Sequence, residues 1–195
     1  MKKDYLIGKT NILSKMKNIN TVFIARSLDG YIADRNGGLD WLSATPNPEN
    51  LDLGYEKFIK NVDALVMGRI TFETVCAFDC EWPYHIPVFV ISKTLAAVPE
   101  EYKDKAEIVK GPVSEIVELI HQKGFTRLYI DGGATVQSFL KEDLIDELII
   151  TTIPVLLGGG TPLFTELPEE MEFEHLESTV YLNALVQDCY RRKRK

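Results

Sequence analysis

The chain has 195 residues, of which 45% are hydrophobic and 26% charged, a composition typical of one folded globular domain and not of a disordered protein. Its formal net charge of −7 excludes a general attraction to nucleic acid or to an anionic membrane surface. No apolar run approaches the roughly 20 residues of a membrane span. We therefore expect the main partner to be a small molecule, with no nucleic acid and no membrane.

The first 19 residues are polar and aperiodic. They lack the sustained apolar core and the small-residue cleavage site of a signal peptide, so we expect an N-terminal extension without chemistry, followed by one domain over 20–192. The three cysteines cannot pair completely, and the three histidines are scattered. This pattern favours a reducing cytoplasm and predicts no metal site.

From residue 21 onward, short β-forming runs alternate with segments of helical periodicity. In chain order the predicted elements are strand 21–25, helix 51–62, strand 64–68, helix 70–78, strand 87–92, strand 107–109, helix 112–123, strand 127–130, helix 134–140 and strand 147–151. Pro112 suits the first helical position and Gly124 the position after the last turn. The alternation predicts an α/β fold with a largely parallel sheet.

The end of the chain has a different pattern. Residues 173–181 and 185–190 resemble two strands joined around Asn183, which predicts an antiparallel hairpin at the edge of the sheet.

Three predicted strands are followed by small or polar residues, at the sheet edge where open α/β sheets bind ligands. The first group is Gly68, Arg69 and Thr71, the second is Ser92 and Lys93, and the third is the run Asp131-Gly132-Gly133-Ala134. Glycines before a helix allow phosphate to approach free backbone N–H groups. Taken singly, the glycine pair is more often a tight turn, Arg69 a solvated surface charge, and Ser92-Lys93 an ordinary loop. Neither the Rossmann glycine fingerprint nor a Walker A sequence is present.

Two loops stand out. Residues 27–42 form a long loop with two aromatics, Tyr31 and Trp41, that look exposed; it is either a lid or binding loop, or a surface loop pinned by Trp41. Residues 158–164 begin with three glycines, which either serve a site or let the loop pass under the sheet edge.

Six motifs in this order resemble the dihydrofolate reductase superfamily, and more closely the branch that includes the reductase domain of riboflavin biosynthesis. They are the strand with Ala25, the loop 28–33, Met67-Gly68-Arg69-x-Thr71, Ile91-Ser92-Lys93, Asp131-Gly132-Gly133-Ala134 and the run 159–164. The resemblance covers about residues 20–192. It implies a three-layer fold, with a mixed, mostly parallel sheet between helices on both faces and the C-terminal hairpin at its edge.

The resemblance also implies NADPH as cofactor, and it assigns roles to residues already named. By similarity, Ala25 and Ile32 flank the nicotinamide, and Ser92 and Lys93 lie near the adenosine 2′-phosphate. The remaining cofactor residues bind phosphates from two helix starts: Gly68, Arg69 and Thr71 at one, and Gly132, Gly133, Ala134 and Thr135 at the other. A small ring substrate is expected near Asp52, Trp41 and Thr151. A homodimer is one expected assembly.

Three comparisons with the superfamily bear on the substrate. Asp52 stands at the position of the acid of true dihydrofolate reductases and is the candidate catalytic residue, although Glu56 and a plain surface role are alternatives. The stretch 81–87 contains no arginine, although a folate tail needs one there. The His-x-Glu and Pro-Cys-x-x-Cys motifs of a zinc deaminase are also absent.

The leading hypothesis is therefore an NADPH-dependent reductase of a pyrimidine- or pterin-like ring, with 5-amino-6-(5-phosphoribosylamino)uracil as the best-named substrate. The alternatives are dihydrofolate reductase, disfavoured by the missing arginine, and a non-catalytic nucleotide-binding protein.

Overall fold

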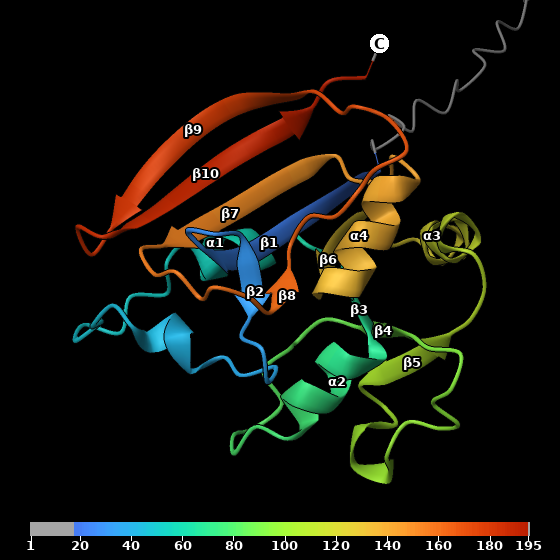
Figure 1. Cartoon of the computed structure of the whole chain (residues 1–195). Coiled ribbons are helices and arrows are strands. Elements are labelled where there is room, and N and C mark those ends of the chain that lie inside the picture. The colour runs from blue at the N-terminus through green and yellow to red at the C-terminus, as the bar shows by residue number, and fades with distance from the viewer. Residues whose placement is uncertain (1–17, 195) are drawn as a thin grey trace, which may run out of the picture.

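An eight-stranded sheet runs through the centre of the computed structural model, which describes residues 18–194 (Figure 1). The strand order is β5-β4-β3-β6-β1-β7-β10-β9. The strands are β1 (Ile19–Ser27), β3 (Ala64–Gly68), β4 (Val88–Ile91), β5 (Ala106–Val109), β6 (Arg127–Asp131), β7 (Glu147–Ile153), β9 (Phe173–Tyr181) and β10 (Leu185–Arg192). Neighbours from β5 to β7 are parallel, whereas β10 pairs antiparallel with β7 and β9. The predicted mixed, mostly parallel sheet with an antiparallel C-terminal hairpin is confirmed.

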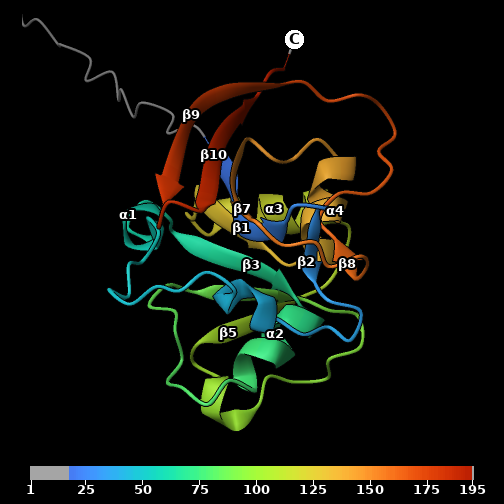
Figure 2. The same ribbon diagram turned by 60° about the vertical axis from the view of Figure 1, so that its left-hand side comes forward.

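Helices cover both faces of this sheet, which gives the predicted three layers (Figure 2). The helices α1 (Tyr55–Ile59) and α2 (Arg69–Cys76) pack on one face, and α3 (Val113–Gln122) and α4 (Gly133–Lys141) on the other. Strand alternation decides which side chain meets which helix: Leu65 packs with Phe72 of α2, while Val66 packs with Phe139 of α4. Because both faces are covered, β3 and β4 are apolar throughout.

The helix predicted over 51–62 is wrong in its extent, because α1 covers only Tyr55–Ile59. Leu53 and Gly54 have φ values of +53° and +85°. Neither value is compatible with a right-handed helix, so the helix can begin only at Tyr55. The apolar periodicity was misleading at its start: Leu51 is exposed, and Leu53 packs against the cluster of Trp41, Ile153 and Leu185 instead of lying on the helix.

A second, two-stranded sheet joins the two loops that the sequence left without structure. β2 (Tyr31–Ala33) pairs antiparallel with β8 (Thr161–Pro162). Gly160, with φ +135°, makes this approach possible, since a Cβ there would lie 2.0 Å from the carbonyl oxygen of Ala33. The sequence predicts neither strand, because β2 has only 3 residues and β8 only 2, too few for an alternating pattern.

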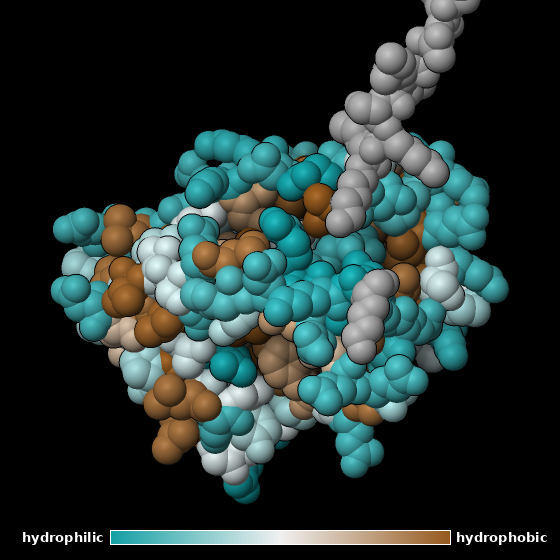
Figure 3. Space-filling model, turned by 90° about the horizontal axis from the view of Figure 1, so that it is seen from above, coloured by the Kyte–Doolittle hydropathy of each residue, from teal (hydrophilic) through white to brown (hydrophobic). Residues whose placement is uncertain are grey.

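The surface above the hairpin is mainly hydrophilic, with hydrophobic side chains gathered toward the end where Figure 1 shows the β9–β10 turn (Figure 3). Two exposed apolar residues, Val180 and Val186, are register partners on β9 and β10. The homodimer stays a prediction.

Most of the predicted extension, residues 1–19, lies outside the described residues, and β1 already begins at Ile19. Within 18–194, no helix combines the length and apolar character needed to cross a membrane. The same residues contain no group of three or more His, Cys, Asp or Glu side chains that could hold a metal ion.

Candidate functional site

Two helix starts meet at the carboxyl edge of the sheet. The helices α2 and α4 follow the neighbouring parallel strands β3 and β6, in which Met67 is paired with Asp131. No side chain caps either helix in the described structure. Their first-turn N–H groups and the positive ends of both dipoles are therefore available to an anion, as the sequence predicted for this edge.

The two helix starts interlock through a glycine and a threonine from each side. A Cβ on Gly132 would lie 2.2 Å from Thr71 Oγ1, and a Cβ on Gly68 would lie 3.0 Å from Thr135 Oγ1. Gly132 also has φ +88°, a conformation that side chains disfavour. The structure thus brings together Gly68, Thr71, Gly132 and Thr135, which the sequence had placed in one cofactor site.

The small sheet closes this site from the side of the first loop. A Cβ on Gly133 would lie 2.9 Å from Ile32 Cδ1 and 3.1 Å from Thr161 Cγ2. Ile32 therefore lies directly over the start of α4. Ile32 and Thr161 leave no room for a side chain at position 133, which explains why a glycine opens this helix.

The two predicted cations, Arg69 and Lys93, lie at the same sheet edge, but only Arg69 forms an ion pair among the described residues. Arg69 opens α2, is partly exposed and forms an ion pair with Glu73 at 2.6 Å. Lys93 is exposed and follows β4, the strand next to β3. The side chain of Ser92 is buried, and its Oγ accepts hydrogen bonds from the backbone N–H groups of Thr94 and Leu95 at 3.2 and 2.8 Å. The Ser92 hydroxyl therefore shapes the turn that carries Lys93.

The predicted substrate residues gather on the face that carries α1. Ala25 of β1 is the register partner of Thr151 of β7, and Ala25 packs against the cluster that contains Trp41. Trp41 looked exposed in the sequence, but it is only 9% exposed and packs with Ile153 and Leu185. Its buried indole Nε1–H has no hydrogen-bond partner among the described residues.

Asp52 lies before α1 and not within it, which corrects its predicted place on a helical face. Its side chain is exposed, and its carboxylate accepts hydrogen bonds from the N–H groups of Glu56 and Gly54 at 2.7 and 3.3 Å. These bonds lower the pKa of Asp52. Glu56 is exposed and paired with Lys60. Asp52 is thus an anion that organises the turn before α1, and it is poorly suited to donate a proton.

A second carboxyl group, Asp131, is better suited to hold a proton. It ends β6 directly before Gly132, whose N–H donates to its Oδ1 at 2.8 Å. Burial raises the pKa of Asp131 to about 6. Burial, followed by the charge of Asp131, also raises the pKa of Tyr55 and of Tyr84. A carboxyl group with a pKa of about 6 takes up a proton just below neutral pH, far more readily than an exposed aspartate.

Sequence reasoning singled out the Asp131-Gly132-Gly133 run but assigned a role only to its glycines. The available signal was an acidic residue at the end of a buried strand, immediately before a helix start. Its burial could not be inferred, because the strands β3 and β1 that flank β6 come from distant parts of the chain.

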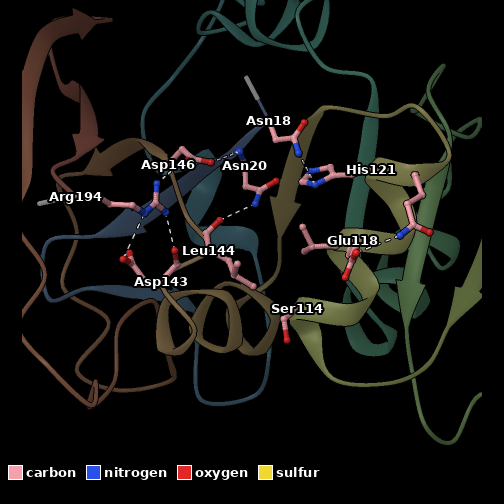
Figure 4. A pocket seen from close by; sticks show the side chains of 11 residues that line it. Asn18, Asn20, Ser114, Glu118, His121, Asp143, Leu144, Asp146 and Arg194 are labelled. Carbon is pink, nitrogen blue, oxygen red and sulfur yellow. Dashed lines mark hydrogen bonds and ion pairs between the residues drawn. The ribbon is translucent and has the colours of Figure 1, made fainter. Parts of the chain in front are cut away.

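A hollow of about 580 Å³ lies at the opposite, amino edge of the sheet (Figure 4). Its walls carry Asn18, Asn20, His121 and an Arg194 that pairs with Asp143 and Asp146. None of the predicted site residues lines it. The polar groups there hold the chain ends to the sheet: Asn20 Nδ2, for example, donates to the carbonyl oxygen of Leu144 at 2.7 Å.

Comparison with known proteins finds relatives over most of the chain. Residues 20–186 match the family model of the RibD C-terminal domain. The chain is 37% identical to the uncharacterized protein YwjB of Bacillus subtilis over 178 residues, which are 90% of this chain and 98% of that protein.

Solved structures show the same fold. A protein from Shewanella sp. PV-4, whose name assigns it to riboflavin biosynthesis, superposes with a TM-score of 0.88 at 55% identity, over 90% of this chain and 99% of that one. Dihydrofolate reductase from Enterococcus faecalis, solved with NADP(H), superposes with a TM-score of 0.61 at 19% identity, over 90% of this chain and 97% of that one. The likeness to dihydrofolate reductases is therefore one of fold.

Proposed function

This chain belongs to the RibD C-terminal domain family, a branch of the dihydrofolate-reductase-like superfamily, and we propose that it is an NADPH-dependent reductase that transfers hydride to a pyrimidine- or pterin-like ring. The most specific activity that we propose is reduction of 5-amino-6-(5-phosphoribosylamino)uracil. The observation that carries the proposal is the interlock of Gly68 and Thr71 with Gly132 and Thr135 at two uncapped helix starts.

The residues present fit a dinucleotide phosphate. Thr71 and Ile32 pack so closely on Gly132 and Gly133 that only backbone fits at the start of α4. The first-turn N–H groups of α2 and α4 carry no side-chain cap, so they can donate to phosphate oxygens. Arg69 and Lys93 add two cations at the same edge, and guanidinium is well shaped for phosphate. Arg69 would exchange its pairing with Glu73 for a phosphate oxygen. When bound, the nicotinamide supplies the hydride.

The protein's own contribution is to orient the ring and to manage one proton. Ala25 and Ile32 would flank the nicotinamide, and Trp41 and Thr151 lie beside Ala25, where the second ring would bind. Asp131 would hold the proton on Oδ2, since Oδ1 accepts from Gly132. With its pKa raised to about 6, a minor protonated fraction persists at neutral pH and would donate that proton to the substrate.

The test is a purified protein mixed with NADPH and 5-amino-6-(5-phosphoribosylamino)uracil, followed by loss of NADPH absorbance. A rise in melting temperature with NADPH, together with turnover, supports the proposal. NADPH binding without turnover of any pyrimidine or pterin favours the non-catalytic alternative. Absence of NADPH binding overturns the assignment altogether.

A further inference from the structure

We propose that Gln187 of the C-terminal hairpin is a positioning residue of the substrate site, which holds the Leu53–Gly54 turn in place and orients the hydroxyl group of Thr151. The effect of Gln187 on turnover rests on the proposed reductase function. Its role in holding the Leu53–Gly54 turn concerns the ligand-free protein and does not depend on that function.

The amide of Gln187 is buried, with the residue 7% exposed, and it bridges two parts of the site. Its Nε2 donates to the carbonyl oxygen of Leu53 at 3.2 Å and to Thr151 Oγ1 at 2.9 Å. The carbonyl oxygen of Leu53 can only accept, so the nitrogen of the amide must face the turn. Both amide hydrogens are therefore used.

This bridge fixes the role of the Thr151 hydroxyl. Because Thr151 Oγ1 accepts from Gln187, its own hydrogen is left to point toward another acceptor. Thr151 is buried and lies next to Ala25 in the sheet, where the ring substrate is proposed to bind. The arrangement favours a ring that presents an acceptor to Thr151, such as the carbonyl oxygen or unprotonated nitrogen of a pyrimidine.

The same bridge holds a strained turn. Leu53 has φ +53°, a conformation that non-glycine residues rarely adopt, and Gly54 follows with φ +85°. A Cβ on Gly54 would lie 2.9 Å from Tyr181 Oη, so the hairpin contacts the turn at a second point. The N–H of Gly54 in turn binds Asp52 Oδ1, which couples the hairpin to the carboxylate of Asp52.

The test uses two replacements of similar size. Gln187→Met removes both donors, and Gln187→Glu places an acceptor against the Leu53 carbonyl and the Thr151 oxygen. Gln122→Met, the same replacement on the exposed surface of α3 on the other face, is the matched control. Amide hydrogen exchange at Gly54 and Glu56 is measured in the full, ligand-free chain, beside the melting temperature and the dissociation constant for NADPH.

In Gln187→Met we expect exchange at Gly54 and Glu56 to accelerate about three- to tenfold, the value of one hydrogen bond, without a change in NADPH affinity. With 5-amino-6-(5-phosphoribosylamino)uracil, kcat/KM should fall in both variants, and further in Gln187→Glu, which takes up the Thr151 hydrogen. The control should match the parent chain in every measurement.

Unchanged exchange at Gly54 and Glu56 in both Gln187 variants overturns the positioning role. Accelerated exchange with an unchanged kcat/KM overturns its catalytic half. A parent chain that exchanges as expected but never oxidises NADPH contradicts the proposed function, and the exchange comparison still decides whether Gln187 holds the turn.

Discussion

The hydroxyl oxygen of Thr71 lies 2.2 Å from the point that a Cβ on Gly132 would occupy, so the start of α2 touches the backbone that opens α4. No side chain larger than hydrogen fits there without moving one helix against the other. The contact joins two helices into one site through residues 61 positions apart in the sequence, at the place where the phosphates are proposed to bind.

Gly132→Ala should therefore destabilise the fold and weaken NADPH binding. The positive φ alone costs about 1 kcal/mol, and the clash with Thr71 adds on the order of 1–3 kcal/mol. Gly124→Ala is the matched control, because Gly124 has φ +96° with no atom within 4 Å of its Cβ position. Urea unfolding of both variants should show the larger loss at Gly132; equal losses would mean that Thr71 yields freely.

Saturating NADPH should raise the melting temperature. A ligand present at about 100 times its dissociation constant adds about 2.7 kcal/mol to the free energy of unfolding, or roughly 5–10 °C for a domain of this size. Thermal melts with and without millimolar NADPH measure this. No shift would contradict the cofactor assignment.

Replacing Arg69 and Lys93 together with alanine should weaken NADPH more than NADH. Charged hydrogen bonds to phosphate contribute roughly 1.5–3 kcal/mol each, and the exposure of both side chains favours the lower value, so we expect at least about a tenfold loss specific to NADPH. Dissociation constants for both cofactors decide it. An equal loss for both would show that neither cation distinguishes the 2′-phosphate.

The sequence predicted the sheet, its parallel majority and the C-terminal hairpin because apolar runs report burial locally. It also placed Gly68, Thr71, Gly132 and Thr135 at one edge. It failed where contacts between distant segments decide the conformation: Leu53 leaves helical geometry to pack with Trp41, and β2 exists only because Gly160 lets β8 approach Ala33. The raised pKa of Asp131 likewise comes from its burial in the folded chain, which no local pattern reveals.

Asp131→Asn should stabilise the protein at alkaline pH. The pKa of Asp131 is raised by burial to about 6 in the folded state from 3.8, so the charged form is less favourable in the folded than in the unfolded chain. The wild type therefore loses stability as the pH rises from about 4 through 6, and the asparagine variant does not. The gap in unfolding free energy, on the order of 1–3 kcal/mol, should open between pH 4 and pH 8. Parallel pH profiles of the unfolding free energy would contradict this.

Turnover should nevertheless fall in the Asp131→Asn variant, because the proposed proton donor is gone.

Dihydrofolate should be a poor substrate. Its glutamate tail needs a cation in the stretch before β4, and residues 81–87 contain no arginine or lysine. In the structure Trp82 and Tyr84 of this stretch pack against the cluster of Phe72 and Tyr129, so the position is filled by aromatic rings. Losing a charged, hydrogen-bonded contact costs on the order of 2–5 kcal/mol, or about 30-fold to more than 1,000-fold in affinity. A compact pyrimidine does not need that contact. We therefore expect a Michaelis constant for dihydrofolate far above micromolar, measured by NADPH oxidation beside the uracil substrate, and efficient turnover of micromolar dihydrofolate would make dihydrofolate reductase the better assignment.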